Sequence, residues 1–165
     1  MSHRVFLGTG SNLDDRLANL QKANDALNSI ATIDQKSKIY ETKPWGFTDQ
    51  PAFLNQILSA TTDLDPFDLL ASIKAMENEI GRIPTFRFGP RLIDIDILFF
   101  DDLVLDEECL IIPHPYITER ALVMVPLHKI APQLFHPRLQ RTIHDLIAGM
   151  DVSDVNLYEG SPLED

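Results

Sequence analysis

The chain is poor in cysteine, in basic residues and in long apolar runs. Its 165 residues include one cysteine, Cys109, which excludes an intramolecular disulfide and a cysteine-based zinc cluster. Lysine and arginine total 14 against 25 acidic residues, and the net charge of −11 argues against a nucleic-acid or anionic-membrane surface. No apolar run reaches membrane-spanning length, and residues 5–7 are too short a run for a signal peptide. We therefore expect a cytoplasmic monomer that binds small molecules.

The composition fits one folded domain. Hydrophobic residues make up 44% of the chain and charged residues 24%, which is ordinary for a globular protein of this length. Residues 149–165 contain five acids and neither lysine nor arginine. We expect a domain over residues 1–148 and a solvated acidic tail over residues 149–165.

Residues 89–100, Gly-Pro-Arg-Leu-Ile-Asp-Ile-Asp-Ile-Leu-Phe-Phe, organise the rest of the sequence. From Leu92 onward this stretch predicts a buried strand. Alternation places Asp94 and Asp96 on one face, about 7 Å apart, because successive strand side chains point to opposite faces. The other face then carries Ile93, Ile95, Ile97 and Phe99.

Two neighbouring buried carboxylates repel each other, and a cation between them is the simplest remedy. Mg²⁺ uses one or two protein carboxylates and completes its shell with water and phosphate oxygens, so the pair suggests a phosphoryl-transfer site. The alternative is a pair of aspartates that meet arginines or face solvent. Residues 82–91 favour the phosphate interpretation, because Arg82, Arg87 and Arg91 gather there in an otherwise acidic chain, although pairing with surface acids remains open.

The N-terminal half predicts strands over residues 4–7, 33–42 and 53–62, and helices over 14–30 and from Asp65 to Gly81. Residues 8–12 predict a glycine turn whose N–H groups can bind an anion, without a Rossmann or P-loop signature. Residues 43–52 predict a loop that packs on the core or acts as a lid. In strand 53–62, Phe53 and Asn55 share a face with Ile57 and Ser59, and a ring beside an amide suits a planar heterocycle.

The later segments offer further candidates. Glu77 lies beside the apolar stripe of its helix, where it contacts a ligand or faces solvent. Residues 103–105 predict a strand in a hairpin with the aspartate strand. His114, between two prolines, donates to phosphate, acts as a general acid or stands in a structural turn. Residues 142–148 predict a short final helix.

Taken in order, several motifs resemble one family. They are Gly-Thr-Gly-Ser-Asn at residues 8–12, Tyr-Glu-Thr at 40–42, Asp-Gln-Pro at 49–51, Phe-Leu-Asn at 53–55, Gly-Pro-Arg at 89–91 with both aspartates, and Pro-His-Pro at 113–115 with Arg120. Between about residues 5 and 137 the chain resembles 6-hydroxymethyl-7,8-dihydropterin pyrophosphokinase. The resemblance implies an α+β, ferredoxin-like fold with a central antiparallel sheet flanked by helices.

It also implies transfer of diphosphate from ATP to the hydroxymethyl group of the dihydropterin, with release of AMP, in folate biosynthesis. Asp94 and Asp96 match ligands of two Mg²⁺ ions, and Arg82 and Arg91 match catalytic positions. Matches to ATP-binding positions are Glu77, Arg82, Arg87, Arg91, Ile97, Leu110, Ile111, His114 and Arg120. Matches to the pterin pocket are Thr42, Lys43 through its backbone, Trp45, Phe53, Asn55, Phe88 and Leu122, with Phe53 and Leu122 as the stacking pair.

The chain differs from the family at residues that match the nucleotide-binding positions. The loop at residues 84–86 is one residue shorter and lacks a basic pair, and Cys109 stands where relatives often carry an arginine. Ile111 replaces a threonine and Phe88 a tryptophan. These changes predict weaker ATP binding with intact metal ligands.

Two other classes are compatible with parts of the pattern. A haloacid-dehalogenase-like phosphatase also uses Asp-x-Asp at a strand end, but it needs a small or hydroxyl residue where Leu98 stands. A non-catalytic ferredoxin-like module would sense a small molecule without turnover. Release of AMP, of inorganic phosphate or of neither separates the three classes.

Overall fold

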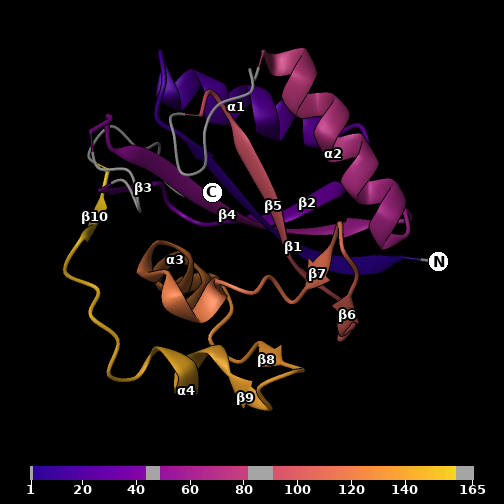
Figure 1. Cartoon of the computed structure of the whole chain (residues 1–165), viewed down its shortest axis with the longest axis vertical. Helices are drawn as coiled ribbons and strands as arrows, with labels where there is room; N and C mark the ends of the chain where they lie inside the picture. Colours follow the sequence, from indigo (N-terminus) through magenta and orange to yellow (C-terminus); the bar gives the residue numbers. More distant parts are fainter. Residues whose placement is uncertain (1, 44–48, 82–90, 159–165) are drawn as a thin grey trace.

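A computed structural model describes residues 2–43, 49–81 and 91–158 of the chain. Its centre is an antiparallel sheet with the order β10-β3-β4-β1-β5, and β2 pairs with β4 beside this path (Figure 1). The strands are β1 (His3–Ser11), β2 (Thr32–Lys36), β3 (Tyr40–Thr42), β4 (Phe53–Thr62), β5 (Asp94–Phe100) and β10 (Val155–Leu157). The sheet and its helices form a mixed α and β fold with an antiparallel sheet, as the sequence predicts.

Helices cover both faces of the sheet. Helices α1 (Arg16–Leu27) and α2 (Pro66–Ile80) lie on one face, and α3 (Ala121–Ile130) and α4 (Ile143–Ile147) lie on the other (Figure 1). The first core joins Leu20 and Ile73 of α1 and α2 to Val5, Leu7 and other strand residues. The second core joins α3 and α4 to Phe6, Ile57, Leu98 and Phe99. Within the described residues, no helix combines the length and apolarity needed to cross a membrane.

The ends of α2 follow the sequence signals. Asp65 is the N-cap and accepts a hydrogen bond from the Asp68 N–H at 2.8 Å, and Pro66 opens the first turn, where its missing N–H costs nothing. Gly81 ends the helix in the left-handed conformation, with φ of 114°. These caps fix α2 behind β5, the strand that carries the aspartates.

Small elements complete the chain. They are β6 (Leu105–Asp106), β7 (Ile111–Ile112), the 3₁₀ turn η1 (Ile117–Glu119), β8 (Phe135–His136) and β9 (Arg141–Thr142). Strand β6 pairs with β7, and β8 pairs with β9. The predicted hairpin between residues 103–105 and the aspartate strand is therefore wrong, because the short strand turns to β7 instead. The final helix is confirmed, with Thr142 as its N-cap.

The predicted glycine turn at residues 8–12 is also wrong. Strand β1 continues through Gly8, Thr9 and Gly10 to Ser11, pairing with β4 on one side and with β5 on the other as far as Gly10. Glycine mid-strand is unfavourable by propensity, but two ladders of backbone hydrogen bonds outweigh that cost. The motif therefore places glycines on the sheet surface instead of N–H groups at a helix end.

Two strands differ from their predicted patterns. The ladder between β1 and β5 shifts register at Phe6 and Leu7, which pair with Phe99 and Ile97. Phe99 therefore packs with the α3 side, opposite the face of Ile93, Ile95 and Ile97, so its predicted facing is wrong. Residues 33–42 form β2 and β3 with a break at residues 37–39, where the Ser37 N–H donates to the Ile57 carbonyl at 2.8 Å.

Part of the predicted tail is structured. Strand β10 pairs with β3, and the Tyr158 N–H donates to the Ile39 carbonyl at 2.9 Å. The expectation of a wholly solvated segment from residue 149 is corrected for residues 155–158. The division into a domain over 1–148 and a tail stays a prediction.

Candidate active site

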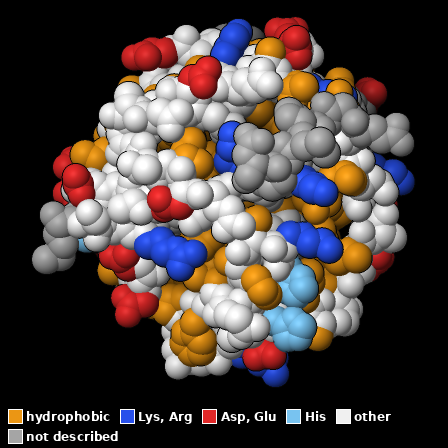
Figure 2. Space-filling view, turned by 180° about the vertical axis from the view of Figure 1, so that it is seen from behind, with side chains coloured by type: hydrophobic (Ala, Val, Ile, Leu, Met, Phe, Trp, Pro, Cys, Tyr) orange, Lys and Arg blue, Asp and Glu red, His pale blue; other side chains and the backbone are white. Residues whose placement is uncertain are grey.

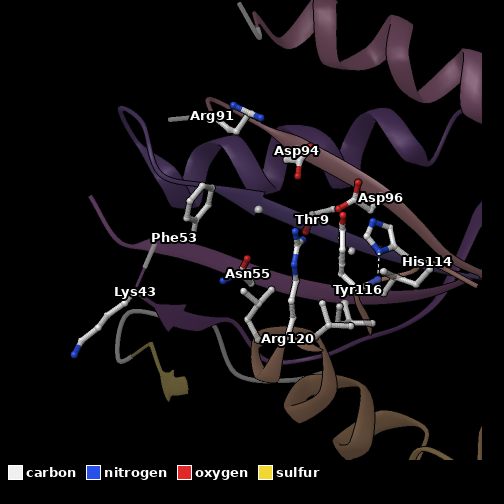
Figure 3. Close-up of a pocket in the computed structure, with 16 residues that line it drawn as sticks. Thr9, Lys43, Phe53, Asn55, Arg91, Asp94, Asp96, His114, Tyr116 and Arg120 are labelled. Atoms are coloured by element: carbon white, nitrogen blue, oxygen red, sulfur yellow. Dashed lines mark hydrogen bonds between the residues drawn. The ribbon is translucent and has the colours of Figure 1, made fainter. Parts of the chain in front are cut away.

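A pocket of about 240 Å³ opens on the α3 side of the sheet (Figure 3). Strands β1, β4 and β5 line it, and the first turn of α3 and the segment around His114 close one side. Nine of the predicted site residues meet there: Lys43, Phe53, Asn55, Arg91, Asp94, Asp96, His114, Arg120 and Leu122. Residues from distant stretches of the sequence therefore share one cavity, because the sheet order brings their strands together.

Asp94 and Asp96 lie on the pocket face of β5, as strand alternation predicts. They pair across the ladder with Gly10 and Gly8 of β1, so no neighbouring side chain of β1 shields them. Burial, then repulsion from Asp94, raises the pKa of Asp96 to about 8, with a smaller contribution from Glu77. Arg120 and Lys74 act in the opposite direction. The ionised pair therefore favours an added cation.

The donor set fits a hard divalent ion. Among the described residues, no group of three or more His, Cys, Asp and Glu side chains converges as a complete metal site. Two carboxylates beside a cavity instead match the way Mg²⁺ binds, with water and substrate oxygens as its remaining ligands. Asp94 and Asp96 are thus suited to an ion that arrives with a phosphate ligand.

Positive charge faces the carboxylates. Arg120, the residue before α3, extends into the pocket toward the aspartates, and its guanidinium lies 5.0 Å from the ring centre of Tyr116 (Figure 3). Stacking on a ring holds a guanidinium by its flat face, so that the N–H groups at its edge can bond to oxygen atoms. Arg91 contributes a second guanidinium from the entrance to β5. An anion in the pocket would meet both arginines.

His114 is held as a neutral donor. Its Nδ1 accepts a hydrogen bond from the Tyr116 N–H at 3.2 Å, which leaves the proton on Nε2. Burial, followed by the charge of Arg120, lowers the pKa of His114 to about 4, while Asp94 acts weakly in the other direction. A neutral imidazole is a poor acid near pH 7, so this environment favours the hydrogen-bond donor over the general acid, and the role of His114 stays a prediction. The side chain is instead poised to donate Nε2–H.

The ring of Phe53 and the side-chain amide of Asn55 form the β4 wall of the pocket. Phe53 and Asn55 line the pocket from β4, and the Asn55 Nδ2 donates to the Thr42 Oγ1 at 2.9 Å. This contact orients the amide and leaves Oδ1 beside Gly10, where an added Cβ would come within 3.0 Å. Thr42 is buried and acts through Asn55, whereas Lys43 lies at the rim with its ammonium 3.8 Å from Asp154. The wall presents a flat apolar ring beside an oriented acceptor.

Four predicted ATP contacts do not line the pocket. Glu77 is 1% exposed, and its Oε2 accepts from the Ile95 N–H at 2.8 Å, so the solvent alternative is wrong and the side chain anchors β5 to α2. The side chains of Ile97 and Leu110 belong to the core on the far face, and Ile111 is exposed on β7. Contacts of these residues with a nucleotide stay predictions.

Other predictions fall outside the described residues. They concern Trp45, Arg82, Arg87 and Phe88, the lid hypothesis for the middle of residues 43–52 and the shortened loop at residues 84–86.

The sequence reasoning missed part of the pocket lining. Gly8 and Gly10 form its floor, and Tyr116 stands between His114 and Arg120. The spacing of the glycines by two residues was the available signal, because residues two apart in a strand share a face. Ile57 was predicted on the correct face but without a role in the pocket.

Known proteins resemble this chain along most of its length. The sequence profile of the 7,8-dihydro-6-hydroxymethylpterin-pyrophosphokinase (HPPK) family matches residues 6–132. The 2-amino-4-hydroxy-6-hydroxymethyldihydropteridine pyrophosphokinase of Aquifex aeolicus is 42% identical over 141 residues, which cover 86% of this chain and 88% of that protein. The folic acid synthesis protein FOL1 of Dictyostelium discoideum is 43% identical over 138 residues, 84% of this chain but 21% of that protein.

The fold agrees with a solved structure. Plasmodium falciparum HPPK-DHPS, crystallised with pterin and p-hydroxybenzoate, superposes with a TM-score of 0.72 at 19% identity. The match covers 88% of this chain and 41% of that one, so the present chain corresponds to a part of the larger protein.

Proposed function

The chain belongs to the 7,8-dihydro-6-hydroxymethylpterin-pyrophosphokinase family, the pyrophosphokinases of folate biosynthesis, and on this premise we propose that the pocket over β1 is its active site. There the diphosphate of ATP passes to the hydroxymethyl group of 6-hydroxymethyl-7,8-dihydropterin. The hydroxyl oxygen loses its proton to water and bonds to the β-phosphorus. The bond between the β-phosphorus and the bridging oxygen breaks, and AMP leaves with that oxygen. The observation that carries this proposal is that Asp94 and Asp96 line one cavity together with Arg91 and Arg120.

We propose that Asp94 and Asp96 hold two Mg²⁺ ions together with the triphosphate. When bound, such ions neutralise phosphate charge and align the attacking and leaving oxygens. The aspartates supply oxygen ligands from a rigid strand whose Ile95 N–H is anchored by Glu77. The raised pKa of Asp96 supports this role, because burial and then the neighbouring Asp94 disfavour the charged carboxylate, which a bound cation would stabilise.

Arg91, Arg120 and His114 bind the phosphates in this proposal. The guanidinium groups match phosphate oxygens through paired donors and stabilise charge as it develops in transfer. His114 adds Nε2–H as a neutral donor, so it binds phosphate without changing protonation near pH 7. Figure 2 shows several lysine and arginine side chains on one face of a protein whose net charge is −11. Local positive charge thus attracts the nucleotide despite the net charge of −11.

Phe53 and Asn55 bind the pterin in this proposal. The ring of Phe53 stacks on one face of the heterocycle, and Leu122 of α3 covers the other. Asn55 Oδ1 accepts from a ring N–H, because the bond from Nδ2 to the Thr42 Oγ1 orients the amide. Gly10 permits close approach to the floor. The order β3-β4-β1-β5, with α1 and α2 on one face, supports the further proposal that the fold is ferredoxin-like.

Product analysis tests the proposal. The purified chain is mixed with ATP, Mg²⁺ and 6-hydroxymethyl-7,8-dihydropterin, and AMP and phosphate are separated chromatographically. We expect AMP to form in proportion to the dihydropterin consumed. Inorganic phosphate as the product would support the phosphatase class, and binding of either compound without turnover would support a sensing module.

A further inference from the structure

Asn12 is a buried polar residue with no role in the chemistry described so far. It follows β1 directly, at the end of the Gly-Thr-Gly-Ser-Asn motif, and is 1% exposed. It does not line the pocket. A buried amide is costly unless its donors and acceptor are bonded, so its partners reveal what it is for.

One set of partners lies at the entrance to β5. The Asn12 N–H donates to the Arg91 carbonyl at 3.0 Å, and the Arg91 N–H donates to the Asn12 Oδ1 at 2.8 Å. Two bonds in opposite directions fix the backbone of Arg91 relative to the end of β1. Arg91 lies three residues before Asp94, so this contact sets the phosphate side of the pocket.

The second set lies at the entrance to β4. The Asn12 Nδ2 donates to the Gln50 Oε1 at 2.8 Å and to the Pro51 carbonyl at 3.0 Å. Pro51 lies two residues before Phe53, the ring of the pterin wall. One carboxamide therefore accepts from the phosphate side of the pocket and donates to the pterin side.

We propose that Asn12 is a positioning residue that holds the two walls of the pocket in register. The inference rests on the proposed function, which places the attacking hydroxyl on one wall and the β-phosphorus on the other. A transfer reaction depends on the distance between these two groups, and a displacement of about 1 Å can cost on the order of a hundredfold in rate. Asparagine suits the position because its short side chain accepts at one atom and donates at the other.

The test compares Asn12→Ala with a matched control, Asn19→Ala. Asn19 is also buried, 4% exposed, and its Nδ2 donates to the Ser11 Oγ at 3.2 Å and to the Leu13 carbonyl at 3.0 Å, but it reaches neither wall. Rates of AMP release give kcat and both KM values, calorimetry gives the affinity for each substrate alone, and thermal melting gives Tm.

We expect Tm to fall by a similar amount in both variants. Only in Asn12→Ala should kcat fall, by on the order of a hundredfold. The affinity of Asn12→Ala for each substrate alone should fall much less, because alignment matters only when both are bound. The proposal is overturned if Asn12→Ala retains kcat within about threefold of wild type, or if Asn19→Ala loses as much. Wild-type protein that releases no AMP would instead refute the proposed function.

A second variant covers the case in which Asn12→Ala fails to fold. Asn12→Asp keeps the acceptor for the Arg91 N–H but cannot donate to Gln50 or Pro51. We expect this variant also to lose kcat, by no more than Asn12→Ala, with little change in either KM. A kcat within about threefold of wild type would contradict a link between the walls.

Discussion

At the scale of single residues, the site is governed by two groups whose pKa values move in opposite directions for the same reason. Desolvation disfavours the charged form of each, which raises the pKa of the Asp96 carboxyl and lowers that of the His114 imidazole. Each group therefore remains neutral over a wider pH range than it would in water. Both give predictions that need no substrate.

Asp96 should make the metal-free protein less stable as pH rises. Its pKa is about 8 in the folded state against 3.8 for an ordinary aspartate in water, so between these pH values the folded state holds more protons than the unfolded state. Stability must then fall with rising pH, by at most about 1.4 kcal/mol per pH unit. Chemical denaturation from pH 4 to 8, without divalent ions, measures the slope.

Asp96→Asn should flatten that slope and stabilise the metal-free protein near pH 8. The same variant should reduce turnover by at least about a hundredfold, because an amide is a poor ligand for a hard cation. Phe67→Ala, on the exposed side of α2, is a control that should leave both the slope and the turnover unchanged. An Asp96→Asn variant with wild-type turnover would remove this residue from the metal site.

His114 should not titrate in the physiological range. With a pKa near 4, the His114 imidazole stays neutral at pH 6 to 8. Its protonation lowers the stability of the folded protein only at pH values below about 6.5. NMR titration of the ring protons should therefore give no midpoint above pH 5. A midpoint of His114 near 6.5 would mean that Arg120 and burial do not act as described.

At the scale of elements, the sequence predicted the helices and strands that have a clear residue pattern and clear start and stop residues. Strand β4 and helix α2 match their predicted ranges, since β4 alternates cleanly and α2 carries a proline start and a glycine stop. The glycine turn failed because local propensity was considered without the two partner strands that pair with β1. The facing of Phe99 failed because a register shift leaves no sign in the sequence.

The residues that line the pocket were more predictable from the sequence than the residues that hold the surrounding strands in place. Residue types with distinctive chemistry were identified, Asp94 from strand alternation and Arg120 from the family resemblance, and both line the pocket. Glu77 and Asn12 make backbone hydrogen bonds instead, and a backbone partner far along the chain has no signature of its own. Contacts of this kind follow from topology, which a pattern of residue types does not contain.

The glycines of β1 allow a matched pair of substitutions. A Cβ at Gly10 would lie 3.0 Å from Asn55 Oδ1 and 3.7 Å from a ring carbon of Phe53, whereas a Cβ at Gly8 would meet Leu98 and Ile57 at ordinary distances of 3.5 and 3.6 Å. Gly10→Ala should therefore raise the KM for dihydropterin by about tenfold or more, with a smaller effect on ATP. Steady-state kinetics with each substrate varied in turn will measure this. If Gly8→Ala impairs dihydropterin binding equally, the specific role of Gly10 is wrong.

At the scale of the whole molecule, residues 155–158 belong to the folded sheet. Arg16 of α1 donates to the Glu41 carboxylate at 2.7 Å and to the Ala52 carbonyl at 2.9 Å, and its guanidinium lies 5.7 Å from the ring centre of Tyr158. The segment at Tyr158 thus packs behind the segments that carry Thr42 and Phe53. Composition alone suggested a tail because acidic residues dominate it.

Removal of residues 149–165 should weaken dihydropterin binding and lower Tm by several degrees, because β3 then loses its neighbour β10. A shorter truncation, of residues 159–165, retains the described contacts and serves as the control. Calorimetry with dihydropterin and thermal melting provide the two measurements. A long truncation that behaves like the short one would support the predicted domain over residues 1–148. The monomeric state and the cytoplasmic location also stay predictions.

The absence of a side chain at Gly10 of β1 has a consequence for the energetics of the whole protein. Over Phe6, Ile57 and Leu98 the sheet is covered by its own helices, but over Gly10 that second layer is unfinished. A flat ring lying there completes the layer as a side chain would. In the proposed function, bound substrate therefore becomes a temporary part of the hydrophobic core, and the protein should be more stable with dihydropterin than without it.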